Sequence, residues 1–325
     1  MDDSRITAFC IDFNWDLLKR FASPGLYGGA RAEEHLHWYR ELGVNTIQSF
    51  CVSVNGYAWY KSRLAPQTPG MNEQGFLERL TELGHASDMR VMGYFSPGAN
   101  GAWQRSSPDY SHVDIWNRWH VPFSTRYLDY LCRLVEEAVR NVPIDGFMVD
   151  WLWNVEPVWL DCEVEMYDQL MDDRFPGRDH VTAEMVEEFN RRATERAWTR
   201  IRETAKSVRD DCILWLSCND LRDPQVRNTR VPLETDWLMN EHPDPSMLAF
   251  AREVKGPHTK LIQCMAGWQS NPRGDHNAQA LLQRSDLDDV GIYGFAIPDV
   301  ATTLPPEDQG GNARNIEAMK AFLRK

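Results

Sequence analysis

Short apolar runs alternate with segments of helical periodicity along the whole chain. The runs are rich in β-branched and aromatic residues, which favour strands, and the segments between them repeat apolar residues three and four positions apart. The expected strands are residues 6–13, 44–52, 90–95, 146–152, 213–218, 236–240, 260–265 and 290–297. The expected helices are residues 32–42, 76–83, 125–142, 182–208, 247–254, 278–283 and 313–323. Eight strand–helix units without a change in composition predict an α/β fold, a single (β/α)₈ TIM barrel over residues 1–325.

The connections between these elements differ in length at the two ends of the strands. Segments that lead from a helix into the next strand are short, whereas those that follow strands are long and rich in Gly, Pro and Trp, as in residues 96–124, 153–181, 267–277 and 298–312. A TIM barrel builds its active site from the loops after its strands. The asymmetry therefore predicts one elaborated, functional face. A doubly wound open sheet is disfavoured because no Gly-x-Gly-x-x-Gly follows the first strand.

Composition narrows the classes of partner and compartment. The chain has 35 basic and 48 acidic residues, a net charge of −13, which disfavours nucleic acid and anionic membranes as partners. No apolar stretch approaches the ~20 residues of a membrane span. The amino-terminal sequence lacks the features of a signal peptide, and five of the seven cysteines lie in apolar runs, so we expect reduced thiols and a cytoplasmic protein. The sequence leaves open whether the protein forms a homo-oligomer.

Acidic residues interrupt the apolar runs where strands should meet the loop face. Asp150 ends the fourth run, and Glu241 follows the sixth. A carboxylate at such a position loses hydration, which is costly unless it serves a function or finds a partner. The alternatives are that Asp150 caps the following helix or holds an Arg of a loop, and that Glu241 forms an ion pair with a cation of a loop. Asp220, after the fifth run, is a rival to Glu241, although it could simply begin a turn.

Further polar and aromatic residues near the strand ends suit a carbohydrate substrate. Hydroxyl groups need acidic and amide partners, and sugar faces stack on aromatic rings. The chain has 13 Trp residues, many of them after strands. The expected substrate-binding residues are Asp12, Asn14, Trp59, Trp103, His112, Trp116, Trp151, Trp153, Asn219, His242 and Trp268.

Motifs of other enzyme classes are absent from the sequence. No His-Glu-x-x-His, Cys-x-x-Cys or Gly-x-Ser-x-Gly occurs, which disfavours zinc proteases, zinc fingers and serine hydrolases. We therefore expect neither a metal nor another cofactor. Two alternative functions stay open: a sugar-binding barrel without catalysis, and a metal-dependent sugar isomerase or epimerase.

Three segments in chain order resemble the α-L-fucosidase-like glycoside hydrolases and the related barrels called hypothetical glycosyl hydrolases. They are residues 43–60, residues 76–96, and residues 127–153 with Asp150-Trp151-Leu152-Trp153, which resembles the family's Asp-x-x-Trp signature. The resemblance implies a retaining glycosidase with Asp150 as nucleophile, and we expect Glu241 as acid/base. The chain departs from the family at residues 53–57, where fucosidases carry paired histidines, and at Met148, where they carry Trp.

Overall fold

Eight parallel strands close into a barrel, which confirms the predicted fold. The computed structural model describes residues 5–18, 20–113, 119–265 and 281–324. The barrel strands are β1 (Thr7–Ile11), β2 (Thr46–Gln48), β3 (Arg90–Phe95), β6 (Gly146–Val149), β7 (Ile213–Cys218), β8 (Trp237–Asn240), β9 (Lys260–Cys264) and β10 (Gly291–Ala296). Each strand pairs with its neighbour in chain order, and β10 returns to β1 to close the ring.

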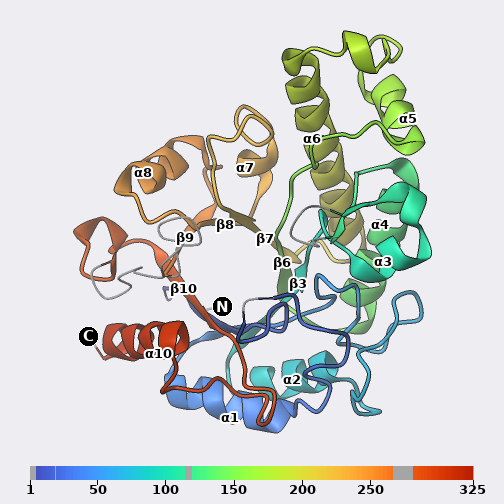
Figure 1. Cartoon of the computed structure of the whole chain (residues 1–325). Helices are drawn as coiled ribbons and strands as arrows, with labels where there is room; N and C mark the ends of the chain where they lie inside the picture. Colours follow the sequence, from blue (N-terminus) through green and yellow to red (C-terminus); the bar gives the residue numbers. More distant parts are fainter. Residues whose placement is uncertain (1–4, 19, 114–118, 266–280, 325) are drawn as a thin grey trace.

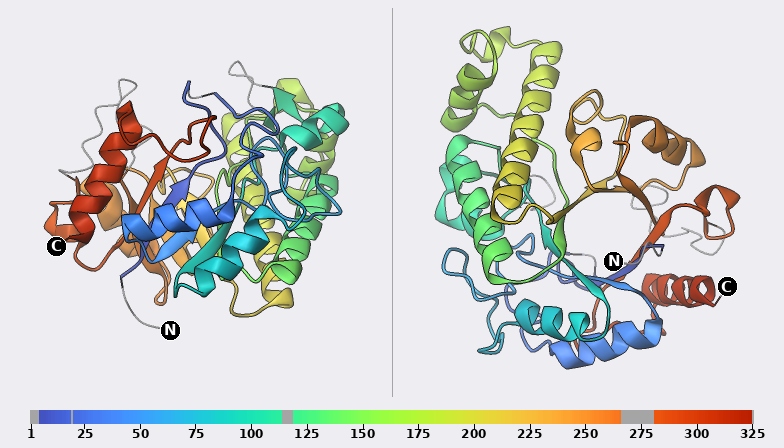
Figure 2. Two further views of the ribbon diagram at one scale, coloured as in Figure 1. Left: turned by 90° about the horizontal axis from the view of Figure 1, so that it is seen from below. Right: turned by 180° about the vertical axis from the view of Figure 1, so that it is seen from behind.

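Helices surround the strands, as Figures 1 and 2 show. They are α1 (Ala32–Leu42), α2 (Phe76–His85), α4 (Thr125–Asn141), α6 (Ala183–Val208), α7 (Val231–Glu234), α8 (Pro245–Val254) and α10 (Gly310–Leu323). The first half of the helix expected at residues 278–283 lies outside the described residues. No helix in the described ranges is long and apolar enough to cross a bilayer.

The loops after the strands carry short elements that the apolar pattern did not predict. They are α3 (Gly101–Ser106), the hairpin of β4 (His112–Val113) and β5 (Trp119–His120), α5 (Asp161–Leu170), and the 3₁₀ helices η1 (Pro108–Tyr110), η2 (Arg178–His180) and η3 (Ser285–Leu287). Helix α5 packs beside the long α6, and the pair extends beyond the ring of helices (Figure 1). Because β4 and β5 form a separate sheet, the fourth strand of the barrel is β6.

Helix α4 illustrates how the sequence pattern produces this packing. The Ser124 hydroxyl accepts a hydrogen bond from the Tyr127 amide at 3.3 Å and caps the helix. Residues three and four apart, among them Leu128, Leu131 and Val135, are fully or almost fully buried. Their burial joins α4 to one contiguous core that extends through the barrel.

Polar side chains fix the amino-terminal ends of the strands. Asp145, just before β6, accepts a hydrogen bond from the Val91 amide at 2.8 Å and lies 2.9 Å from His85 Nε2. Asp236, just before β8, accepts in the same way from the Leu214 amide at 2.8 Å. Both carboxylates thus tie one strand to the start of its neighbour. The polar groups at the amino-terminal end of the barrel therefore stabilise the fold.

Asp145→Ala is expected to lower the free energy of unfolding by about 1–3 kcal/mol, because it leaves the Val91 amide without its acceptor. Denaturant-induced unfolding measures this change. Asp173→Ala, at an exposed position, is the matched control and should change stability by less than about 0.5 kcal/mol. Equal effects of the two substitutions would contradict this role of Asp145.

Candidate active site

Three acidic residues stand directly after three barrel strands. Asp12 follows β1, Asp150 follows β6 and Glu241 follows β8. In a closed parallel barrel all carboxyl ends of strands lie at the same end, so these side chains belong to one ring. Asp12 and Glu241 are only 7% and 8% exposed. The carboxylates are close enough for the charge of Asp150 to raise the pKa of each of the other two.

Hydrogen bonds to its carboxylate hold Asp150 in place. The Tyr94 hydroxyl, from β3, donates to Oδ2 at 2.7 Å, and the Trp151 amide donates to Oδ1 at 2.9 Å. The Asp150 amide donates to the Phe95 carbonyl at 3.0 Å and extends the pairing of β6 with β3. Side chain and backbone are therefore fixed together, as an attacking group requires.

The residue after Asp150 has an unusual backbone. Trp151 has a φ of 54°, in the left-handed region that residues other than glycine rarely adopt. In this conformation the Trp151 amide donates to Asp150 Oδ1, and the Trp151 carbonyl accepts a hydrogen bond from the Gly98 amide at 2.9 Å. A Cβ at Gly98 would lie 2.5 Å from that carbonyl oxygen, so the approach requires glycine. Such strain at a carboxylate marks a functional position.

Ser217, on β7, connects the carboxyl group of Glu241 to that of Asp150. Its hydroxyl is hydrogen-bonded to Glu241 Oε1, and a hydrogen bond from the same side chain lowers the pKa of Asp150. The charge of Asp150 also raises the pKa of Glu241, which requires the two carboxyl groups to lie near each other. Asp150 and Glu241 therefore form a close pair across β7.

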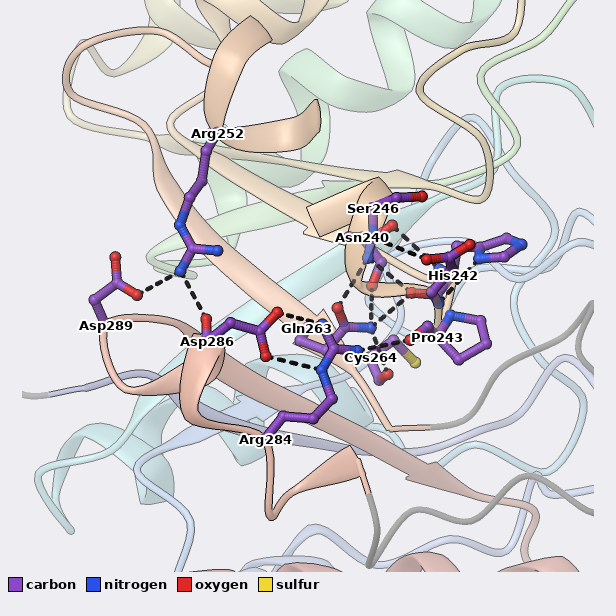
Figure 3. Close-up of polar contacts among 11 residues, drawn as sticks. Asn240, His242, Pro243, Ser246, Arg252, Gln263, Cys264, Arg284, Asp286 and Asp289 are labelled. Atoms are coloured by element: carbon purple, nitrogen blue, oxygen red, sulfur yellow. Dashed lines mark hydrogen bonds and ion pairs between the residues drawn. The ribbon is translucent and has the colours of Figure 1, made fainter. Parts of the chain in front are cut away.

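The turn after Glu241 is held by amide side chains from β8 and β9, shown in Figure 3. Asn240 Nδ2 donates to the His242 carbonyl at 2.8 Å and to Gln263 Oε1 at 2.8 Å. Gln263 Nε2 donates to the same His242 carbonyl at 3.1 Å, and Arg284 Nη1 donates to the Pro243 carbonyl at 2.6 Å. Asn240 and Gln263 are fully buried. This network fixes the backbone that carries Glu241 and its neighbour His242.

Burial shifts the protonation of all three acids in the same direction. Desolvation raises the pKa of Asp150 to about 6, against the hydrogen bonds from Tyr94, Trp151 and Ser217, which lower it. Desolvation, and then the charge of Asp150, raises the pKa of Glu241 to about 8. Desolvation likewise raises the pKa of Asp12 to about 7. Near neutral pH, Asp150 is the ionised member of the pair and Glu241 is the protonated one.

Aromatic rings line up beside Asp150. Trp151 stacks on Trp153 with ring centroids 5.0 Å apart and on His120 at 5.8 Å, and Phe21 lies 5.6 Å from Trp151. Trp153 is only partly buried. A partly open indole next to a carboxylate pair is a surface on which a flat apolar face of a ligand could stack.

The other residues predicted from the sequence have varied surroundings. Asn14 Oδ1 accepts from the Val54 amide at 2.9 Å, and the Asn14 amide donates to Asp12 Oδ1 at 2.8 Å, so both lie together after β1. Asn219, just after β7, is half-buried, and its Oδ1 has no hydrogen-bond partner within the described ranges. His242 Nδ1 accepts from the Asp244 amide at 3.1 Å.

Four predicted residues have partners elsewhere in the protein. Trp59 is buried and stacks on Phe13 at 4.0 Å, and Trp103 stacks on Tyr130 at 4.9 Å. His112 Nε2 lies 3.0 Å from the carboxylate of the buried Glu163. Asp220 is exposed, and its Oδ1 accepts from the Arg222 amide at 2.8 Å, the pattern of a turn.

Trp116 and Trp268 lie outside the described residues. Conversely, the sequence reasoning did not single out Tyr94, Ser217 or His120. Tyr94 and Ser217 lie within apolar strands, and a polar group in such a strand was the only feature of the sequence that could have marked them as site residues.

Replacing any of the three acids by its amide should stabilise the fold at alkaline pH. A carboxyl group with a raised folded-state pKa stabilises the folded protein at acidic pH, and this contribution is lost as the pH rises through the folded-state value. Asp12→Asn, Asp150→Asn and Glu241→Gln stay uncharged, so each should raise Tm near pH 9 by about 2 °C or more.

The gain should be smaller near pH 5, where the wild-type acids are largely protonated in the folded state. Thermal unfolding followed by circular dichroism at both pH values measures the difference. A Tm gain that does not depend on pH would show that the three acids are not desolvated together.

Comparison with solved structures gives many barrels of the same fold, although no protein-family model and no curated protein matches the sequence. Alpha-L-fucosidase isoenzyme 2 from Paenibacillus thiaminolyticus superposes with a TM-score of 0.73 over 99% of this chain, with 17% identity. This chain spans 49% of that fucosidase. The glycoside hydrolase domain of PgaB (BpsB) from Bordetella bronchiseptica gives a TM-score of 0.61 with 11% identity, covering 98% of both chains. An Anoxybacillus alpha-amylase gives 0.54 with 12% identity, over 98% of this chain and 78% of the amylase. The structural neighbours of this barrel therefore include an α-L-fucosidase and other glycoside hydrolases, as the resemblance in sequence led us to expect.

Proposed function

We propose that this protein is a glycosidase that cleaves a glycosidic bond with retention of configuration, with Asp150 as nucleophile and Glu241 as acid/base. The observation that carries the proposal is the pair of carboxyl groups on the two sides of β7, Asp150 and Glu241, whose pKa values are separated in the required order. Retaining glycosidases place their two carboxyl groups ≈ 5–5.5 Å apart, and inverting ones ≈ 6.5–9.5 Å apart. Contact with a shared serine favours the shorter separation.

The proposed reaction has two steps. In the first, Asp150 forms a bond to the anomeric carbon while the bond to the leaving oxygen breaks, and Glu241 gives its proton to that oxygen. In the second, Glu241 takes a proton from water as the water oxygen attacks the anomeric carbon, and Asp150 leaves as the carboxylate. Glu241 ends protonated and Asp150 ionised, so the starting state is restored.

The proposed sugar site lies between the aromatic rings and the polar groups after the neighbouring strands. Trp153, which is partly buried, would stack on a sugar face, and the buried Trp151 beneath it would hold its ring in place next to Asp150. Asp12, Asn14 and Asn219 would bind hydroxyl groups, and Asn219 Oδ1, which has no partner among the residues that the structure describes, could accept one of these bonds. Trp59, Trp103 and His112 are left out of the proposed set because they are buried against other side chains of the protein.

A fucoside is the first substrate to test. The Asp150-Trp151-Leu152-Trp153 segment resembles the fucosidase signature, and the barrel of a fucosidase superposes on this one. All seven cysteines are free and buried, which suits a reducing compartment, so a cytoplasmic location is part of the proposal.

A panel of nitrophenyl glycosides, including the α-L-fucoside, tests the proposal. We expect turnover of at least one substrate, and a loss of at least about 10³-fold in kcat/KM for Asp150→Ala, because the nucleophile is gone. The profile of kcat/KM against pH should be bell-shaped. It should fall below about pH 6, where Asp150 becomes protonated, and above about pH 8, where Glu241 loses its proton.

Each alternative function gives a different result. A sugar-binding barrel without catalysis would bind a sugar and turn over no member of the panel, and Asp150→Asn would leave its affinity nearly unchanged. A metal-dependent isomerase would lose its activity on treatment with a chelator. Either result would refute the proposed glycosidase.

Glu241→Ala should slow substrates with poor leaving groups far more than activated nitrophenyl substrates, since only the former need the proton. Azide should restore turnover of activated substrates and give a glycosyl azide of retained configuration, which NMR identifies. The control is Asp220→Ala, which removes an exposed carboxylate in a turn and should change kcat/KM by less than about twofold. An inverted product, or a selective loss in Asp220→Ala, would contradict the assignment.

A further inference from the structure

Ser217 stands on the strand between the two strands that carry the catalytic acids of the proposal. The register of β6 with β7 pairs Val149 with Leu216, so Asp150 comes beside Ser217. On the other side, the Ser217 hydroxyl is hydrogen-bonded to Glu241 Oε1. Ser217 is 6% exposed, so no bulk water competes for its hydroxyl.

A serine hydroxyl carries one proton and two lone pairs. It can donate to only one carboxylate at a time, but it can accept from a protonated carboxyl group while it donates to an ionised one. Because Ser217 lies between Asp150 and Glu241, the direction of its O–H bond depends on which of the two acids is ionised.

We propose that Ser217 is a positioning residue whose hydroxyl turns between the two acids during turnover, donating to Asp150 before bond cleavage and to Glu241 after it. This inference rests on the proposed function of the same site.

In the free enzyme, protonated Glu241 donates to Ser217 Oγ, and Ser217 donates to ionised Asp150. When the leaving oxygen takes the proton of Glu241, Asp150 becomes a neutral ester, and the Ser217 hydroxyl turns to the new carboxylate of Glu241. Ser217 Oγ and Glu241 Oε1 are hydrogen-bonded in the structure, and either oxygen can be the donor, depending on which one carries the proton. Attack by water reverses both changes, so no proton is gained or lost at Ser217.

The other titratable groups around Ser217 do not replace it. Tyr94, from β3, donates to Asp150, and burial together with the charge of Asp150 raises its pKa, so it stays protonated. Burial also raises the pKa of Cys218 on β7 and of Cys10 on β1. Asp12, on β1, faces Asp150 and raises the pKa values of its neighbours when ionised. Ser217 is the group among these that reaches both Asp150 and Glu241.

Ser217→Ala tests the inference through the pH profile. The hydroxyl stabilises whichever acid is ionised, so its removal should raise the pKa of both. The acid and alkaline limbs of kcat/KM should therefore both move to higher pH, by about one unit. Ser217→Thr keeps the hydroxyl and should restore the limbs to their wild-type positions.

The matched control is Ser96→Ala. Ser96 follows β3 at the same end of the barrel and is buried, and within the described residues its hydroxyl has no hydrogen-bond partner. This variant should leave both limbs in place. A role of Ser217 in packing alone would lower kcat without moving either limb, and unchanged limbs in Ser217→Ala would overturn the inference.

Infrared difference spectroscopy separates failure of this inference from failure of the proposed function. The C=O band of protonated Asp150 and Glu241, assigned with Asp150→Asn and Glu241→Gln, reports their titration without any turnover. Ser217→Ala should shift both titrations upward even if no glycoside is cleaved. Unshifted titrations would overturn the inference, whereas shifted titrations without any cleavage would refute only the glycosidase.

Discussion

The pairing of β1 with β10 is the constraint on which the rest of the molecule depends. Five residue pairs, from Thr7 with Ile292 to Ile11 with Ala296, join the first and last strands of the barrel. The Asp12 amide adds a hydrogen bond to the Ala296 carbonyl at 2.9 Å. Closure leaves no free sheet edge and brings every carboxyl strand end into one ring. Without it, Asp12 and Glu241 would stand at separate places in an open sheet.

At the carboxyl ends of the barrel strands, desolvated acids lower the stability of the fold but suit acid/base chemistry. Desolvation raises the pKa values of Asp12, Asp150 and Glu241, so part of the folding free energy is lost when these groups ionise. Hydrogen bonds that lower the pKa of Asp150, and the charge of Asp150 that raises the pKa of Glu241, leave Asp150 ionised and Glu241 protonated near neutral pH. Stability is recovered elsewhere, in the contiguous core and at the opposite end, where Asp145 and Asp236 tie strands together.

The two acids are held by different means, which suits their proposed roles. Asp150 has rigid support on both oxygens, from the Tyr94 hydroxyl and from the Trp151 amide with its left-handed backbone. Glu241 has one side-chain donor, Ser217, and a backbone fixed by the buried amides of Asn240 and Gln263. A nucleophile benefits from fixed geometry. An acid/base must exchange its proton twice in each cycle, and a rotatable hydroxyl allows that.

The sequence by itself predicted the barrel strands, the longer helices around them and the face with the long loops, because hydrophobic periodicity and connector length are local properties. The helix expected at residues 182–208 is α6 (Ala183–Val208), and Asp12, Asp150 and Glu241 were recognisable as acids at the ends of apolar runs. Only the tertiary structure decided which polar groups meet. Ser217 and Tyr94 look like ordinary strand residues until closure places them against Asp150, and Trp59 looks like a loop aromatic until it stacks on Phe13. Contacts between residues far apart in the chain depend on register and packing, which a single sequence does not encode in any local pattern.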